Sequence, residues 1–217
     1  MITLAVDSCT RTASCAVVID GRVISSGYID NGNTHSVKLL PLIEKCLKDA
    51  EITPEQIDFY VATRGPGSYT GQRIGLATIK AMAAAHGKVC AGVSSLLTMA
   101  HNMPFFDGII APIIDARSAR VYNGLYRWNG TILDVLQTDR VITIEALLDE
   151  LKDKKVIFMG DGIFSYTDKL KNQLIASPHL SQINASAAAF AWTETISPDQ
   201  LLPLYLQKTQ AEREYKE

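Results

Sequence analysis

The chain has 217 residues, 47% of them hydrophobic and 20% charged, a composition typical of a globular protein with one large domain or two small ones. Its 21 basic and 23 acidic side chains give a net charge of −2, which argues against a protein that grips nucleic acid by itself, because phosphate contacts need a basic surface. No apolar run reaches the roughly 18 residues of a membrane helix and the first residues lack a basic leader, so we expect neither a membrane span nor a signal peptide.

Three strand-like segments joined by a polar turn and an Asp-Gly hairpin open the chain as an antiparallel meander. Alternating helices and strands follow, which predicts a mixed sheet with helices on its faces. The predicted strands are residues 2–6, 13–19, 22–29, 58–64 and 88–92, and the predicted helices are residues 34–50 (capped by Thr34, with Pro41 inside), 70–85 and 94–102 (capped by Ser94).

A linker at residues 104–108 separates this half from a smaller α/β unit. We therefore predict two lobes, residues 1–103 and 104–203, with residues 204–217 returning to the first. In the second lobe the predicted strands are residues 109–114, 119–128, 132–141 and 155–159, and the predicted helices are residues 143–151 (capped by Thr143), 168–174 and 185–195.

The four cysteines lack the paired spacing of metal ligands and lie in apolar segments. Free cysteine in such segments behaves as a small core residue, and a reducing compartment is its simplest setting. We therefore expect buried thiols and a cytoplasmic protein. The cysteines are Cys9, Cys15, Cys46 and Cys90.

The most informative segment is a turn rich in glycine, residues 64–75, where a strand hands over to a helix. One interpretation is anion binding, because a helix start presents unpaired N–H groups and a positive dipole end. The other is that the glycines only allow helix and sheet to pack closely. The segment is neither a Walker A loop nor a dinucleotide fingerprint. The candidate anion or nucleotide contacts are Asp7, Arg64, Gly65, Gly67, Thr70, Gly71 and Arg73.

Asp7 ends the first strand, and we favour a structural role in which its carboxylate caps its own turn. Arg64 and Arg73 flank the glycine turn, and either could hold an anion or pair with Asp7, Asp115 or a carboxylate of a partner. Asp115 and Arg117 at the end of a later strand are interpreted as a structural turn.

Five segments, which together span about the first half of the chain, form a combination that is specific as a set: residues 4–8 (LAVDS), 35–41 (HSVKLLP), 64–75 (RGPGSYTGQRIG), 92–96 (GVSSL) and 114–117 (IDAR). This set resembles the TsaB (YeaZ) family. The resemblance implies an α/β fold of the ASKHA type (actin-like ATPase, ribonuclease H-like), with two lobes built on mixed sheets.

The resemblance also implies a function. TsaB proteins are non-catalytic partners of TsaD in the synthesis of threonylcarbamoyladenosine on tRNA. It thus implies a TsaD-type catalytic subunit and a TsaE-type ATPase as partners, with tRNA contacted only through the complex. It implies no catalytic residue and no intrinsic cofactor, with ATP or ADP only in the complex.

TsaD-like proteins carry His-x-x-x-His after the corresponding strand, and two imidazoles one turn apart can bind one metal ion. The matching positions here are Ser95 and Met99, and the four histidines of the chain offer no such pair. We therefore expect no metal site.

The helix over residues 70–85 is apolar on nearly all faces, which predicts burial on nearly all faces. The helix over residues 34–50 also carries leucines off its main stripe. The second lobe could cover the apolar surface that these two helices leave exposed. We favour instead a helical interface with another protein, as the family's pairing implies. When the protein is alone, the same surface could support a homodimer. The expected interface residues are His35, Lys38, Leu39, Leu42, Ile74, Ala77, Thr78, Ala81 and Met82.

A second hypothesis stays open, an enzyme of the same fold. It would be a small-molecule kinase or a metallopeptidase-like hydrolase. The missing histidine pair opposes metal hydrolysis, and Ser8 and Cys9, where kinases of this fold have a glycine turn, would crowd a phosphate.

Overall fold

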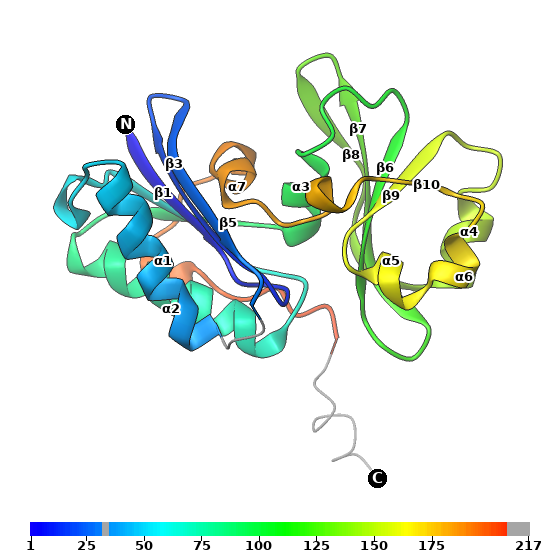
Figure 1. Cartoon of the computed structure of the whole chain (residues 1–217), viewed down its shortest axis with the longest axis horizontal. Coiled ribbons are helices and arrows are strands. Elements are labelled where there is room, and N and C mark those ends of the chain that lie inside the picture. The colour runs from blue at the N-terminus through cyan, green and yellow to red at the C-terminus, as the bar shows by residue number, and fades with distance from the viewer. Residues whose placement is uncertain (32–34, 208–217) are drawn as a thin grey trace, which may run out of the picture.

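In the computed structural model, which describes residues 1–31 and 35–207, the strands form two sheets, one in each of two lobes (Figure 1). The first sheet has the order β3-β2-β1-β4-β5. Its strands β1, β2 and β3 are antiparallel, whereas β4 and β5 run parallel to β1. The strands are β1 (Ile2–Asp7), β2 (Ala13–Ile19), β3 (Arg22–Ile29), β4 (Phe59–Thr63) and β5 (Cys90–Val93).

The opening meander is confirmed, and its hairpin has the expected chemistry. Asp20 and Gly21 both have positive φ, 48° and 77°, as a two-residue hairpin turn requires. Thr34, the predicted cap of the first helix, lies outside the described residues.

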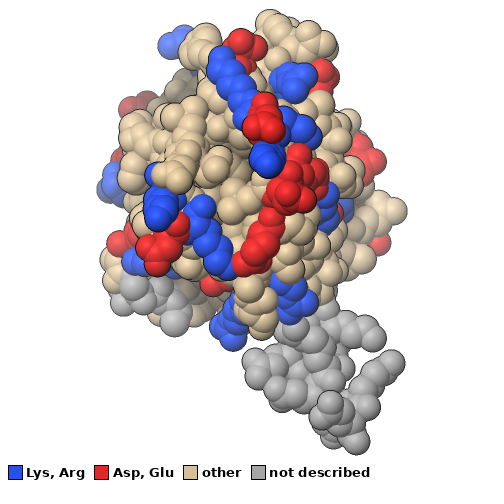
Figure 2. All heavy atoms as spheres, turned by 90° about the vertical axis from the view of Figure 1, so that its right-hand side faces the viewer, with Lys and Arg blue, Asp and Glu red and all other residues tan. Residues whose placement is uncertain are grey.

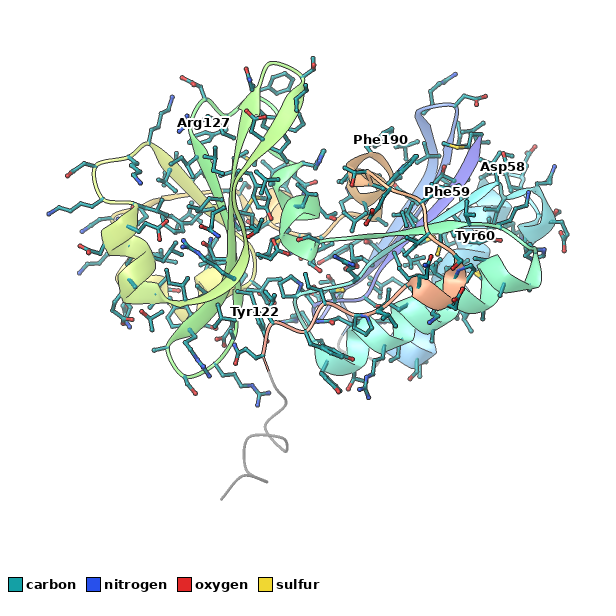
Figure 3. The ribbon with its side chains drawn as sticks, turned by 180° about the vertical axis from the view of Figure 1, so that it is seen from behind. Asp58, Phe59, Tyr60, Tyr122, Arg127 and Phe190 are labelled. Atoms are coloured by element: carbon teal, nitrogen blue, oxygen red, sulfur yellow. The ribbon has the colours of Figure 1, made fainter. Side chains whose placement is uncertain are left out.

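Helices cover both faces of the first sheet. On one face, α1 (His35–Asp49) and α2 (Tyr69–Ala85) lie side by side, and α1 continues through Pro41 as one element (Figure 1). The other face is covered by α7 (Ala185–Ala191), with Trp192 packed against Phe59 at a ring distance of 4.6 Å. Figure 3 shows Phe59 and Tyr60 side by side on β4, and as neighbours in a strand they point to opposite faces.

The second lobe contains the sheet β10-β9-β6-β7-β8. One face packs against short helices, and the other packs on α3 (Ser95–Ala100), whose cap Ser94 accepts from Leu96 N and Leu97 N as predicted. Thr143 likewise caps α4. The elements are β6 (Ile109–Asp115), β7 (Arg120–Asn129), β8 (Ile132–Thr143), β9 (Val156–Met159), β10 (Leu174–Ile175), α4 (Ile144–Glu150), α5 (Gly162–Ser165) and α6 (Thr167–Leu170).

The chain returns to the first lobe earlier than residue 204, the predicted point. Helix α7 already packs on the first sheet, and Ile196 exchanges backbone hydrogen bonds of 2.8 and 2.9 Å with Cys90. Leu201 is part of the core beneath α1 and α2. The predicted second lobe, residues 104–203, is therefore too long at its C-terminal end, because the alanines of α7 fit closely on the first sheet.

All four cysteines are buried free thiols, as expected. In the part of the chain that the structure describes, none of the helices combines the length and apolarity that crossing a membrane requires.

Candidate functional site

The glycine turn is closed on its inner side by the chain's own backbone. A Cβ on Gly67 would lie 2.0 Å from the carbonyl oxygen of Cys9, and one on Gly71 would lie 2.0 Å from that of Ser8. Ser68 N also donates to the Cys9 carbonyl at 2.6 Å, and Ser8 Oγ donates to the Gly71 carbonyl at 2.8 Å. These contacts support the close-packing interpretation of the glycines. On its other side the turn is open, because Gly67, Ser68 and Thr70 line a cleft between the lobes.

Asp7 lies beneath this turn and is fully buried. Its Oδ1 accepts from Cys9 N at 3.1 Å and from the Thr63 hydroxyl, which is the strand-end capping expected for it. Among the described residues, Oδ2 has no hydrogen-bond partner. Burial raises the pKa of the Asp7 carboxyl to about 6, against the opposing effect of these hydrogen bonds.

Neither of the two arginines that flank the turn forms an ion pair with Asp7. Arg64 directly follows β4, and its backbone N–H donates to Val93 O of β5 at 2.9 Å while its carbonyl accepts from Leu204 N at 2.7 Å. Arg73 lies exposed on the second turn of α2. Neither forms an ion pair with the residues that the structure describes. Of the candidate anion contacts, Gly67 and Gly71 pack on Cys9 and Ser8, the residues that directly follow Asp7.

The positions of the TsaD-type histidines are occupied by core residues. Ser95 and Met99 lie on α3, one turn apart, and are 0% and 1% exposed. A hydroxyl and a thioether in this arrangement are not the imidazole donor pair that would hold a metal. No group of three His, Cys, Asp or Glu side chains suited to a metal ion occurs within residues 1–31 and 35–207.

The outer face of α2 is built of small residues. Ala77 and Ala81 are exposed, and Ile74, Thr78 and Met82 beside them are half-buried. Thr78 Oγ1 donates to Ile74 O at 2.9 Å, which satisfies its hydroxyl within the helix. A partner helix could therefore approach this face closely without burying an unpaired polar group.

On α1 the structure corrects part of the expected interface. Lys38, Leu39 and Leu42 are only 4%, 1% and 4% exposed, because they lie on the stripe that faces the sheet. Lys38 Nζ donates to Arg11 O at 2.9 Å. These three side chains are covered within the lobe and so cannot form a surface.

The exposed apolar residues of α1 are instead Val37 and Leu40, at 64% and 58%. Neither was among the residues expected at the interface, because helical periodicity does not indicate which part of the apolar side the sheet covers. His35, at the start of α1, is half-buried, and its Nε2 lies 2.6 Å from Thr10 O.

A shallow groove of about 580 Å³ runs along α1, lined mainly by α1 and by residues 52–54, and Met82 of α2 borders it. It is continuous with the faces just described through Leu40 and Met82. We call Val37, Leu40, Ile74, Ala77, Thr78, Ala81 and Met82, with this groove, the α1–α2 surface. The second lobe does not cover it, because that lobe lies beyond the opposite face of the first sheet (Figure 1).

A cleft of about 550 Å³ separates the lobes. It is lined by Thr10, Ser68 and Thr70 from the first lobe and by Asp115 and Asp161 from the second. Tyr122 of β7 also lines it and lies at the junction of the lobes in Figure 3. Burial, together with the charge of Asp115, raises the pKa of Asp161 to about 6.

The Asp115 turn is structural, as interpreted. Asp115 Oδ1 accepts from Arg117 N at 2.8 Å, and the Asp115 carboxylate also accepts from the hydroxyls of Ser165 and Tyr166. This network fixes the wall of the cleft on the side of the second lobe.

Comparisons with known proteins agree with this geometry. The family model described as TsaD, tRNA N6-adenosine threonylcarbamoyltransferase, matches residues 30–212. The tRNA threonylcarbamoyladenosine biosynthesis protein TsaB of Bacillus subtilis (strain 168) is 32% identical over 226 residues, which covers 100% of this chain and 99% of that protein.

Solved structures give the same result. YeaZ from Pseudomonas aeruginosa has a TM-score of 0.82 and 26% identity, covering 94% of this chain and 99% of its own. An activator of 2-hydroxyisocaproyl-CoA dehydratase from Clostridium difficile, solved with bound ADPNP, has a TM-score of 0.50 at 14% identity over 88% of this chain and 94% of its own, which shows the fold alone. The predicted ASKHA-type fold is confirmed, and the chain belongs to the TsaB (YeaZ) family of tRNA threonylcarbamoyladenosine biosynthesis proteins.

Proposed function

We propose that this chain is a subunit that pairs with a TsaD-type catalytic protein for threonylcarbamoyl transfer to the adenosine next to the anticodon in tRNA. The family membership supports the pathway, and the α1–α2 surface supports the pairing. The chain would act by holding the catalytic subunit in its active shape, and none of its own residues would carry out bond chemistry.

The observation that carries the proposal is the uncovered apolar face of two adjacent helices. Val37 and Leu40 are exposed on α1 and Ala77 and Ala81 on α2, and the two helices lie side by side on the same face of the first sheet (Figure 1). Apolar surface of this kind, with small residues at its centre, suits a close helix–helix interface. In isolation, the same surface would allow a homodimer.

The further partners follow from the same proposal. A TsaE-type ATPase would cycle on the complex, and ATP or ADP would contact this chain only there. On the face of the second lobe shown in Figure 2, basic and acidic side chains alternate, and Lys169–Glu145 and Arg140–Glu150 form ion pairs on this lobe. A mixed surface of this kind fits a protein that reaches tRNA only through its partner. We place this activity in the cytoplasm.

The alternative, an enzyme of the same fold, has no observation in its favour. Gly67 and Gly71 pack closely on the carbonyl oxygens of Cys9 and Ser8, which supports a structural role for these glycines.

The test is reconstitution of the tRNA modification with purified TsaD-type and TsaE-type proteins, with and without this chain. We expect a complex on size exclusion and product only when the chain is present. Full activity without it, or no complex, would contradict the proposal. Micromolar affinity of the isolated chain for ATP would favour the enzyme instead.

A further inference from the structure

A cluster of two tyrosines and one arginine lies at the glycine-turn end of α2. The rings of Tyr69 and Tyr205 stack with centroids 4.5 Å apart and planes inclined by 19°. The Arg73 guanidinium carbon lies 4.0 Å from the centroid of the Tyr69 ring. Arg73 Nε donates to the Tyr205 hydroxyl at 2.7 Å, and Nη2 donates to the Tyr69 hydroxyl. The guanidinium is therefore held in one orientation, although the side chain is exposed.

The Arg73 guanidinium still has N–H donors that could bind a further group. An arginine has five N–H donors, and the two tyrosine hydroxyls engage only part of them. No carboxylate among the described residues forms an ion pair with Arg73. Arg73, Ala77 and Ala81 follow one another at spacings of four, so they lie on one face of the helix. The charge thus borders the α1–α2 surface.

The surroundings favour a carboxylate over a phosphate as the anion. The next cation along α2, Lys80, already donates from Nζ to Asp199 O at 3.3 Å. Within the glycine turn, Gly67 and Gly71, where a phosphate could approach the backbone most closely, pack on the carbonyl oxygens of Cys9 and Ser8. A single planar guanidinium matches one carboxylate with two parallel hydrogen bonds.

We propose that Arg73, oriented by Tyr69 and Tyr205, binds an Asp or Glu side chain of the TsaD-type subunit at the edge of the α1–α2 surface. This inference rests on the proposed function. Because the tyrosines have already fixed the guanidinium, little side-chain freedom is lost on binding, which favours a strong and specific contact. The contact would set the register between the two subunits, since the alanines beside it offer no directional group.

The test is the affinity of the full chain for the purified TsaD-type subunit, measured by calorimetry without nucleotide. Arg73→Gln is expected to weaken binding by roughly 30-fold or more, and Arg73→Lys to restore only part of it, because an ammonium cannot form the paired hydrogen bonds. Tyr205→Phe, which removes one acceptor that orients Arg73, is expected to weaken binding by about 3-fold. Arg127→Gln, which removes an exposed cation from β7 of the second lobe (labelled in Figure 3), is the matched control and should bind like wild type.

A double-mutant cycle completes the test. When each exposed Asp or Glu of the partner's facing helices is changed to Ala, one variant should lose affinity and then show no further loss with Arg73→Gln. Unchanged binding by Arg73→Gln, or the absence of any coupled acidic residue, would overturn the inference. So would a loss that appears only with ATP or ADP present, because the anion would then be a phosphate. If wild type forms no complex, the proposed function itself fails.

Discussion

The inner and outer faces of α2 differ in what covers them. On the inner face, Gly71 and Gly75 contact Ser8 so closely that added Cβ atoms would lie 2.0 Å from its carbonyl oxygen and 2.4 Å from its hydroxyl. On the outer face, Ala77 and Ala81 are exposed. The glycines, which stand out in the sequence, pack against the end of β1 within the chain. The plain alanines form the surface available for recognition.

The largest effect is expected for a substitution on the inner face of α2. Gly71→Ala places a methyl group against the Ser8 carbonyl, and neither backbone can yield without disturbing β1. We expect the free energy of unfolding to fall by about 3 kcal/mol or more, measured by urea denaturation. A midpoint unchanged from wild type would show that the two faces are not distinguished by packing.

The buried carboxylate beneath the inner face gives a pH dependence. Because the pKa of Asp7 is about 6 in the folded protein and lower in the unfolded chain, the folded state binds the proton more tightly. Protonation of Asp7 therefore stabilises the folded protein fully below about pH 4. This stabilisation, on the order of 2–3 kcal/mol, is lost as the pH rises through about 6. Denaturation of wild type and Asp7→Asn across pH 4–7.5 should therefore converge or cross, and parallel curves would refute this assignment.

The neighbouring residues Leu39 and Leu40 lie on the buried and the exposed face of α1, so they test the same contrast. Leu40→Asp, at an exposed site, should leave stability within about 0.5 kcal/mol but weaken binding to the TsaD-type subunit by roughly 10- to 30-fold. Leu39→Asp, at a buried site, should prevent folding because it buries a charge. Circular dichroism and calorimetry measure the two effects, and equal behaviour of the two variants would contradict the assigned faces.

The smallest effect is expected for an alanine-to-glycine substitution on the outer face of α2. Ala77→Gly removes only a methyl group exposed to solvent, so its cost is the helix propensity difference of about 1 kcal/mol. Thermal denaturation measures it. A cost as large as that of Gly71→Ala would mean that Ala77 is packed rather than exposed.

Local signals predicted much of the fold. The Asp20-Gly21 hairpin and the caps Ser94 and Thr143 depend on neighbouring residues alone, and all three are confirmed. The return of the chain at α7 could not be predicted, because a short run of alanines does not indicate which sheet it packs on. Residues 168–174 were wrongly extended as a helix, which ends at Leu170 before β10.

The candidate site was predicted in part for the same reason. Helical periodicity gave the apolar stripes of α1 and α2, but not which edge of each stripe the sheet would cover, so Leu42, which is buried, was expected at the interface. The cluster around Arg73 was missed because Tyr205 is 132 residues away in sequence and lies in a segment without periodicity.

One pair of substitutions tests the α1–α2 surface most directly. Ala81→Glu places a charge at the centre of the outer face of α2, and Ala146→Glu places the same charge on an exposed turn of α4 in the second lobe. Both variants should fold like wild type, and calorimetry with the TsaD-type subunit should show no binding for Ala81→Glu and wild-type binding for Ala146→Glu. Wild-type affinity for a folded Ala81→Glu variant would contradict the account.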